Sequence, residues 1–234
     1  MSILAVSELS KSYGGVHALR ALSFTLAGSE MLAMIGPNGA GKTTCFNVVN
    51  GQLRPDRGEV RFEGRRIDGL PPRTLCRLGI GRTFQVAATF GSMNVRENVQ
   101  VIERDAAMAE SILQAAGIAA LADRQCAELA YGDLKRVEFA IALASRPRLL
   151  LMDEPTAGMA AADRRALMDA IREIAKAREI AVLFTEHDMD VVFGYADRVL
   201  VLADGELIAQ GSPAQVRADA RVRSVYLGEE AADA

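Results

Sequence analysis

Short apolar runs bounded by glycine, proline or aspartate recur along the chain and predict β-strands. The runs cover residues 3–6, 22–26, 31–35, 60–62, 149–152, 180–184 and 199–202. The run at 149–152 reads Leu-Leu-Leu-Met, with no polar residue at alternate positions. Such a run indicates a strand that is buried on both faces, as in a parallel sheet.

Helical spacing separates the later runs. One apolar face is formed by Leu134, Val137, Ile141 and Ala144, and another by Leu167, Ile171 and Ile174. Strands that alternate with helices predict an α/β fold with a mainly parallel sheet and flanking helices. Because several strands precede the first long helix, we also expect an antiparallel β subdomain at the N-terminus.

Residues 86–129 have a different pattern, with helical composition at 95–101, 106–116 and 118–122 and no convincing strand. We interpret this stretch as a helical insertion that interrupts the sheet. The whole chain, residues 1–234, is then one domain with an inserted helical subdomain at about residues 87–140.

Length and charge narrow the class of protein. A chain of 234 residues suits one domain of ordinary size. Its 30 acidic and 27 basic side chains give a net charge of −3, so the basic excess of a nucleic-acid binder is absent and we expect no nucleic-acid partner. The longest stretch without a charged side chain, residues 83–95, is too short to cross a bilayer.

The cysteines and histidines are few. Cys45, Cys76 and Cys126 are far apart and odd in number, which argues against a disulfide framework and for a reducing compartment. With only His17 and His187 as histidines, a zinc site is not expected. The first residues lack the basic start and long apolar core of a secretory signal, so we expect the protein to stay in the cytosol.

Residues 36–43 read Gly-Pro-Asn-Gly-Ala-Gly-Lys-Thr and match G-x-x-x-x-G-K-[ST], the phosphate-binding loop. They follow the apolar run at 31–35 and precede a plausible helix at 44–50, which is the context that this loop requires. Glycines let backbone N–H groups surround an anion, and the helix N-terminus adds a favourable dipole. The motif predicts nucleotide binding, with Lys42 on the β- and γ-phosphates and Thr43 on Mg²⁺; the alternative is a glycine turn beside a surface lysine.

Asp153 and Glu154 directly follow the apolar run at 149–152. A carboxylate at the end of a buried strand is how phosphate-loop proteins hold Mg²⁺, and a second carboxylate can polarise an attacking water as a general base. Taken alone, the pair is equally well explained as a solvated strand end, but its combination with the phosphate-binding loop favours a catalytic role.

With these two motifs the chain resembles the ATP-binding subunits of ABC transporters over residues 4–227. Tyr13 resembles the aromatic that stacks on adenine, Gln85 in Gly-Arg-Thr-Phe-Gln the Q-loop glutamine, and His187 in Thr-Glu-His-Asp the switch histidine. Residues 129–133, Leu-Ala-Tyr-Gly-Asp, stand where the signature sequence belongs. Each has a simpler reading: a strand-edge aromatic, a loop amide, a capping or core histidine.

The resemblance implies a P-loop NTPase core, ATP and Mg²⁺ as ligands, and a set of site residues. Glu154, His187 and Gln85 are the implied catalytic residues, and Thr43, Gln85 and Asp153 the magnesium ligands. The implied ATP-binding residues are Tyr13, Val16, Gly36, Pro37, Asn38, Gly39, Ala40, Gly41, Lys42, Thr43 and Thr44. Signature residues Ala130, Tyr131, Gly132 and Asp133 would contact the nucleotide of a partner subunit.

It also implies partners and a location. Two ATPase subunits, alike or different, would pack head to tail and join two transmembrane permease subunits, with an extracytoplasmic solute-binding protein acting indirectly. The small apolar residues at 86–90 look suited to meeting another protein, although Phe90 equally suits packing within the domain. The subunit would lie at the cytoplasmic face of the inner membrane as a peripheral protein.

Departures from the general family indicate a subfamily. Ala130 and Tyr131 replace the Ser and first Gly of Leu-Ser-Gly-Gly-Gln, and Ala160 replaces an aspartate. With Glu-His-Asp-Met-Asp at 186–190 and Val-Tyr-Leu-Gly at 225–228, the chain looks like the ATPase subunits of branched-chain amino acid importers, whose cargo can be related amino-acid-like or organic-acid solutes. A lipopolysaccharide-exporter ATPase, a soluble ABC ATPase of repair, cofactor assembly or translation, and a non-ABC P-loop kinase are the alternatives.

Overall fold

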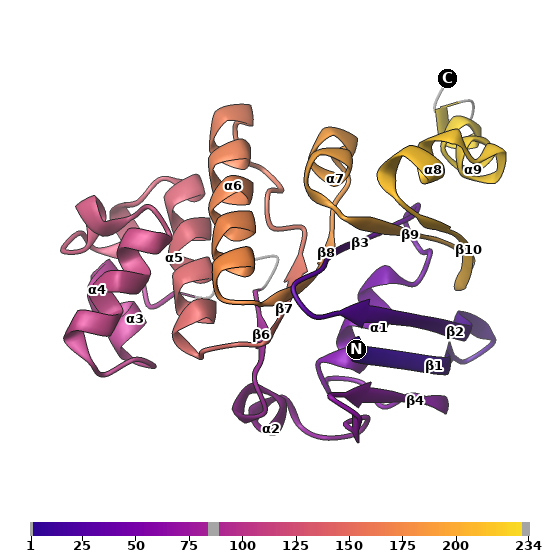
Figure 1. Ribbon diagram of the computed structural model, residues 1–234, viewed down its shortest axis with the longest axis horizontal. Helices are drawn as coiled ribbons and strands as arrows, with labels where there is room; N and C mark the ends of the chain where they lie inside the picture. The colour runs from indigo at the N-terminus through magenta and orange to yellow at the C-terminus, as the bar shows by residue number, and fades with distance from the viewer. Residues whose placement is uncertain (1, 84–88, 231–234) are drawn as a thin grey trace.

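The computed structural model describes residues 2–83 and 89–230, and the side chains up to residue 225 (Figure 1). Two sheets carry the fold. One has four strands in the order β2-β1-β4-β5, and the other has six in the order β10-β9-β3-β8-β7-β6. The first described strand, β1, belongs to the smaller sheet, and the last described helix, α9, contacts the edge strand β10 of the larger one.

The larger sheet is parallel except at one edge. Its strands are β6 (Ile80–Arg82), β7 (Leu149–Asp153), β8 (Ala181–Thr185), β3 (Met31–Ile35), β9 (Arg198–Ala203) and β10 (Glu206–Gly211). Only the pair β9–β10 is antiparallel. Every residue of β3, β7 and β8 is buried, as the run at 149–152 predicts.

The smaller sheet is antiparallel throughout. It consists of β1 (Ser2–Tyr13), β2 (Val16–Ala27), β4 (Arg57–Phe62) and β5 (Arg65–Arg66). The register between β1 and β2 shifts at several places, as β-bulges do. Apolar residues of this sheet share one core with residues of the larger sheet. The predicted N-terminal antiparallel sheet is thereby confirmed.

Helices cover the larger sheet and fill the long interval between β6 and β7. They are α1 (Lys42–Val49), α2 (Pro72–Arg77), α3 (Val95–Gln100), α4 (Ala106–Ala115), α5 (Tyr131–Ala144), α6 (Ala161–Ala177), α7 (Met189–Tyr195), α8 (Pro213–Ala218) and α9 (Ala220–Glu230). Two 3-10 turns, Ala119–Leu121 and Cys126–Glu128, connect α4 to α5. In Figure 1, α3, α4 and α5 gather at one end and the antiparallel sheet at the other.

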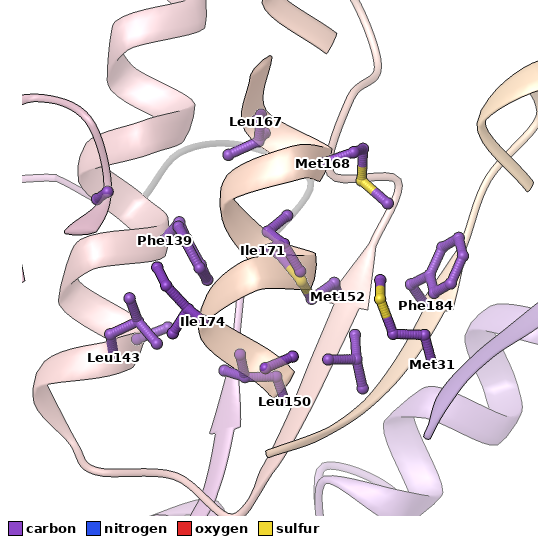
Figure 2. Packing of buried hydrophobic residues seen from close by; sticks show 14 of the residues in the cluster. Met31, Phe139, Leu143, Leu150, Met152, Leu167, Met168, Ile171, Ile174 and Phe184 are labelled. Carbon is purple, nitrogen blue, oxygen red and sulfur yellow. The ribbon is translucent and has the colours of Figure 1, made fainter. Parts of the chain in front are cut away.

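The larger sheet separates two apolar cores. Leu150 and Met152 of β7 point to one face and pack with Ile171 of α6 and Phe184 of β8, as Figure 2 shows. Leu149 and Leu151 point to the other face, toward α1 and the antiparallel sheet. Burial on both faces fixes the register of β7 and therefore the place where Asp153 and Glu154 leave the sheet.

All seven predicted strands are confirmed, as are the helices expected at 95–101 and 106–116, while the one at 118–122 is a single 3-10 turn. Three described strands were not predicted: β5 consists of two exposed arginines, β6 is three residues long with a central glycine, and β10 is a partly exposed edge strand with polar residues. That residues 87–140 form a subdomain of their own stays a prediction.

Candidate active site

The glycine-rich loop at 36–41 connects β3 to α1. A side-chain Cβ on Gly41 would lie 2.4 Å from the carbonyl oxygen of Ala18, and one on Gly36 would lie 2.2 Å from that of Leu202. Gly41 also has a φ of +100°, in the region that glycine tolerates best. The loop is thus held against β2 and β9 by approaches that only glycine permits.

Lys42 closes over this loop. It is 8% exposed, and its Nζ donates hydrogen bonds to the carbonyl oxygens of Gly36 at 2.5 Å and Pro37 at 3.0 Å. A buried ammonium group needs such acceptors to offset the loss of water. The three N–H groups of this ammonium can also donate to an anion that enters the loop.

A cavity of about 290 Å³ brings many of the predicted site residues together, although Gly36, Pro37 and Asp153 are not in its lining. Its lining includes Tyr13 and Ala18 from the β1–β2 hairpin, residues 38–44 of the loop and α1, and Glu154 and His187 from the carboxyl edge of the larger sheet. Val16 does not line this cavity; it lies on the hairpin and is 68% exposed. The cavity joins a phosphate loop, an aromatic ring, a carboxylate and an imidazole.

Two acidic residues leave β7 beside this cavity. Asp153 is 8% exposed, and its Oδ1 accepts a hydrogen bond from the Thr185 hydroxyl at 2.6 Å. Glu154 has a φ of +48°, an uncommon conformation for a residue with a side chain, and its N–H donates to the Thr185 hydroxyl at 3.1 Å. This turn points Glu154 to the next strand's loop, where its Oε1 lies 2.9 Å from Nε2 of His187.

Arg82, at the end of β6, is a site residue to which the sequence assigned no role. Its guanidinium donates to the side-chain oxygens of Asn47 and Gln52 and lies 3.8 Å from Oδ2 of Asp153. Burial lowers the pKa of the Arg82 guanidinium, and the Asp153 carboxylate partly offsets this. The position beside a glutamine-containing motif was the only signal in the sequence.

The signature residues lie outside this cavity. Ala130 precedes the first turn of α5, where Tyr131, Gly132 and Asp133 follow. The Tyr131 ring lies over Gly158, 3.2 Å from where a Cβ there would be, and Gly132 lies close to Asp163. In this chain the signature therefore borders the loop after Glu154, and not the phosphate loop. Gln85 lies outside the described residues.

Two buried polar residues beside the site were also missed. Glu186, before His187, accepts hydrogen bonds from the backbone N–H and the hydroxyl of Thr156, at 2.8 Å and 2.6 Å. Glu186 stands in the Thr-Glu-His-Asp motif, but its contact with Thr156 joins residues thirty positions apart, which spacing alone does not reveal.

Comparison with known proteins places this site in a family. The model of the ABC transporter family matches residues 19–157, and that of the branched-chain amino acid ATP-binding cassette transporter matches residues 206–232. The first match contains the phosphate loop, the signature segment and the Asp153-Glu154 pair.

Curated relatives match over nearly the whole chain. The high-affinity branched-chain amino acid transport ATP-binding protein LivG of Salmonella typhimurium is 35% identical, over 97% of this chain and 98% of its own. The lipopolysaccharide export system ATP-binding protein LptB of Acidithiobacillus ferridurans is also 35% identical, with the same coverage. Among solved structures, the ADP conformation of MJ1267, an ATP-binding cassette of an ABC transporter, is 33% identical over 97% of this chain and 99% of that one, with a TM-score of 0.91.

Proposed function

This chain belongs to the ATP-binding subunit family of ABC transporters, which hydrolyses ATP, and on that premise we propose that it is the motor subunit of an importer for branched-chain amino acids or related solutes. The observation that carries the ATPase part of the proposal is the cavity in which the phosphate loop meets the Glu154–His187 pair. If residues 36–43 were only a flexible glycine turn beside a surface lysine, neither Glu154 nor His187 would be needed next to them.

We assign the nucleotide contacts from this geometry. Tyr13 is placed to stack on adenine, while the loop amides and Lys42 hold the phosphates. Lys42 then exchanges its bonds with Gly36 and Pro37 for phosphate oxygens. Lys42 therefore has oxygen acceptors in either state.

The donor set fits Mg²⁺, which prefers oxygen ligands and usually retains several waters. Among the described residues, the Thr43 hydroxyl and the Asp153 carboxylate are the candidate ligands. Gln85, which lies outside the described residues, is the third candidate. Bound there, the ion supplies positive charge that offsets the charge developing on the phosphates. Thr185 donates to Oδ1 of Asp153, and Oδ2 lies 3.8 Å from the Arg82 guanidinium. Together with the Thr43 hydroxyl, the Asp153 carboxylate would hold the ion.

Glu154 is the general base in this assignment. His187, hydrogen-bonded to Glu154 through Nε2, orients the carboxylate and holds the attacking water or the γ-phosphate. The His187 side chain is about half exposed, so it remains within reach of a ligand in the cavity.

A second ATPase subunit completes the site. The start of α5 offers a helix N-terminus at Gly132, with no residue of 130–133 in the lining of this chain's own cavity. The signature at 130–133 is therefore expected to contact a nucleotide that is bound by another copy, or by a related chain, packed head to tail with this one. An isolated subunit is expected to hydrolyse ATP slowly for the same reason.

Permease subunits are the proposed membrane partners. Apolar side chains that are at least one-third exposed concentrate near the start of the α3–α4 region: Phe90, Met93, Val101, Ile102 and Met108. Of these, Ile102 also lines a mainly apolar groove of about 340 Å³, together with Leu75, Ile80 and Ile141. Such surfaces mark protein contacts. Among residues 2–83 and 89–230, no helix is long and apolar enough to span a bilayer, so attachment through permeases at the cytoplasmic face of the inner membrane is the location we propose.

The cargo follows from relatives only. LivG is named for branched-chain amino acid transport, and the C-terminal match at 206–232 is to the same class. LptB, equally identical, keeps lipopolysaccharide export as the second candidate. A solute-binding protein outside the membrane would deliver the cargo to an importer.

The test is to isolate the tagged chain from native membranes in mild detergent and identify the proteins that accompany it. We expect two permease subunits and a second ATPase, and uptake of labelled leucine into vesicles that hold the complex, ATP and the cognate binding protein. The Lys42→Ala complex is the control without ATP use. Recovery of a homodimer on exporter subunits, or of no membrane partner, would overturn the importer assignment.

A further inference from the structure

The last residues of β7 and β8 and the loops that follow them are joined by three contacts between side chains. The first links the Thr185 hydroxyl to Asp153 Oδ1 at 2.6 Å, and the second links His187 Nε2 to Glu154 Oε1 at 2.9 Å. The third, between Glu186 and Thr156, has no part in the nucleotide chemistry assigned above. Glu186 is 4% exposed and Thr156 is 1% exposed, so this contact is within the protein rather than at the cavity surface.

The two carboxylate oxygens of Glu186 accept hydrogen bonds from different residues. Oε1 accepts from the Thr156 N–H at 2.8 Å and from the Thr156 hydroxyl at 2.6 Å, and Oε2 accepts from the backbone N–H of His187 at 3.2 Å. One carboxylate therefore ties the backbone of His187 to the loop after Glu154. Buried carboxylates are kept only where such donors compensate for lost water.

The turn that this contact spans needs support. Glu154 holds a φ of +48°, a conformation that costs energy for a residue with a side chain and persists where its surroundings enforce it. The Thr156–Glu186 hydrogen bonds anchor the chain two residues after Glu154. The Glu186–His187 hydrogen bond anchors the backbone of His187, whose imidazole contacts Glu154. Asp188, on the other side of His187, caps α7 and pairs with Arg164 of α6.

We propose that Glu186 is a positioning residue: its carboxylate clamps the Thr156 and His187 segments together and so keeps the imidazole on Glu154 during hydrolysis. This inference rests on the proposed ATPase site and adds to it a residue that touches neither nucleotide nor water. An amide in place of the carboxylate retains one acceptor oxygen for Thr156 and turns an NH₂ toward the His187 N–H. Glu186→Gln therefore releases His187 while it preserves the side chain's size.

The test combines steady-state ATP hydrolysis with NMR of ¹⁵N-labelled histidine in the full chain. The protein has two histidines, so His187 gives one of two imidazole spin systems, assigned with His187→Asn. We expect Glu186→Gln to lower kcat by about tenfold with KM for ATP unchanged, and to shift the His187 signals but not those of His17. The exposed Glu173→Gln on α6 is the control for loss of a carboxylate and should change neither.

Two further results separate positioning from general damage. In a His187→Ala background, Glu186→Gln should cause no additional loss of kcat, because both act through the same group. Thr156→Val, which removes the hydroxyl donor, should shift the His187 signals, and Thr156→Ser, which restores it, should return them. This second pair decides the question if Glu186→Gln does not fold.

An unchanged His187 signal in folded Glu186→Gln, or in Thr156→Val, overturns the inference, as does a full additional loss in the double variant. Failure of the proposed function looks different. Wild-type protein without ATPase activity, or Glu154→Gln as active as wild type, would overturn the catalytic assignment. The NMR shifts in nucleotide-free protein would still decide whether Glu186 positions His187.

Discussion

The Nε2 atom of His187 lies 2.9 Å from Oε1 of Glu154, although the two residues are thirty-three positions apart in the chain. They meet because β7 and β8 are parallel neighbours whose carboxyl ends open at the same edge of the sheet. This edge also carries the phosphate loop after β3, so the nucleotide cavity and the acid–base pair share one wall.

Replacement of His187 by alanine should lower kcat by about 10²–10⁴, because Glu154 loses the group that orients it. Steady-state ATP hydrolysis measures kcat, and nucleotide affinity should change little. His17→Ala, at the exposed second histidine on β2, is the control. Equal kcat for the two variants would contradict the role of His187.

Replacement of Lys42 by alanine should abolish the stabilisation of the fold by ATP. At a hundredfold excess of ATP over Kd, the wild type should gain about 2.7 kcal/mol in its free energy of unfolding. Denaturant unfolding with and without ATP measures this gain. Lys176→Ala, at an exposed lysine in the last turn of α6, should retain it. A Lys42→Ala protein still stabilised like the wild type would show that the phosphates bind elsewhere.

Gly41→Ala and Gly39→Ala form a matched pair within the phosphate loop. Both glycines have positive φ, +100° and +83°, so each alanine carries a backbone cost of about 1 kcal/mol. Only at Gly41 does the new Cβ meet a backbone oxygen, that of Ala18 at 2.4 Å, and nothing lies within 4 Å at Gly39. Urea unfolding without nucleotide should therefore show a larger loss for Gly41→Ala. Equal losses of stability would mean that the loop can move away from β2 to accommodate the new Cβ.

The three thiols should react at very different rates. Burial raises the pKa of the Cys45 thiol to about 12 and raises that of Cys126 as well, whereas Cys76 is exposed on α2. Since the thiolate is the reactive form, about one Cys45 in ten thousand is reactive at pH 8, and its access is blocked. A disulfide reagent should modify one thiol quickly in native protein and all three after unfolding. Rapid reaction of a second thiol would contradict the burial of Cys45 and Cys126.

Much of the site could be predicted from the sequence because its parts are contiguous. The phosphate loop is one run between a strand and a helix, and Asp153 and Glu154 directly end a buried run, so local pattern places them. Arg82 beside Asp153 could not be found in this way, because the contact depends on β6, a three-residue strand, pairing with β7. The Thr156–Glu186 contact depends in the same way on the pairing of β7 with β8.

Val16 is an implied ATP-binding residue that lies outside the cavity. It pairs with Tyr13 at the end of the β1–β2 hairpin, but it is 68% exposed, and Tyr13 lines the cavity while Val16 does not. A role for Val16 in ATP binding stays a prediction. Strand β10 was not predicted because it is an edge strand with one partner, and its half-exposed polar residues lack the apolar run that revealed the buried strands.

Glu154→Gln is the most direct test of the account, because it keeps the size of the side chain and removes the base. Nucleotide affinity should match that of the wild type when measured by ATP-dependent stabilisation, and single-turnover hydrolysis of ATP should slow by about 10²–10⁴. Glu173→Gln should behave as wild type. Hydrolysis at the wild-type rate with ATP bound would contradict the assignment of Glu154 as the base and, with it, the mechanism proposed for this site.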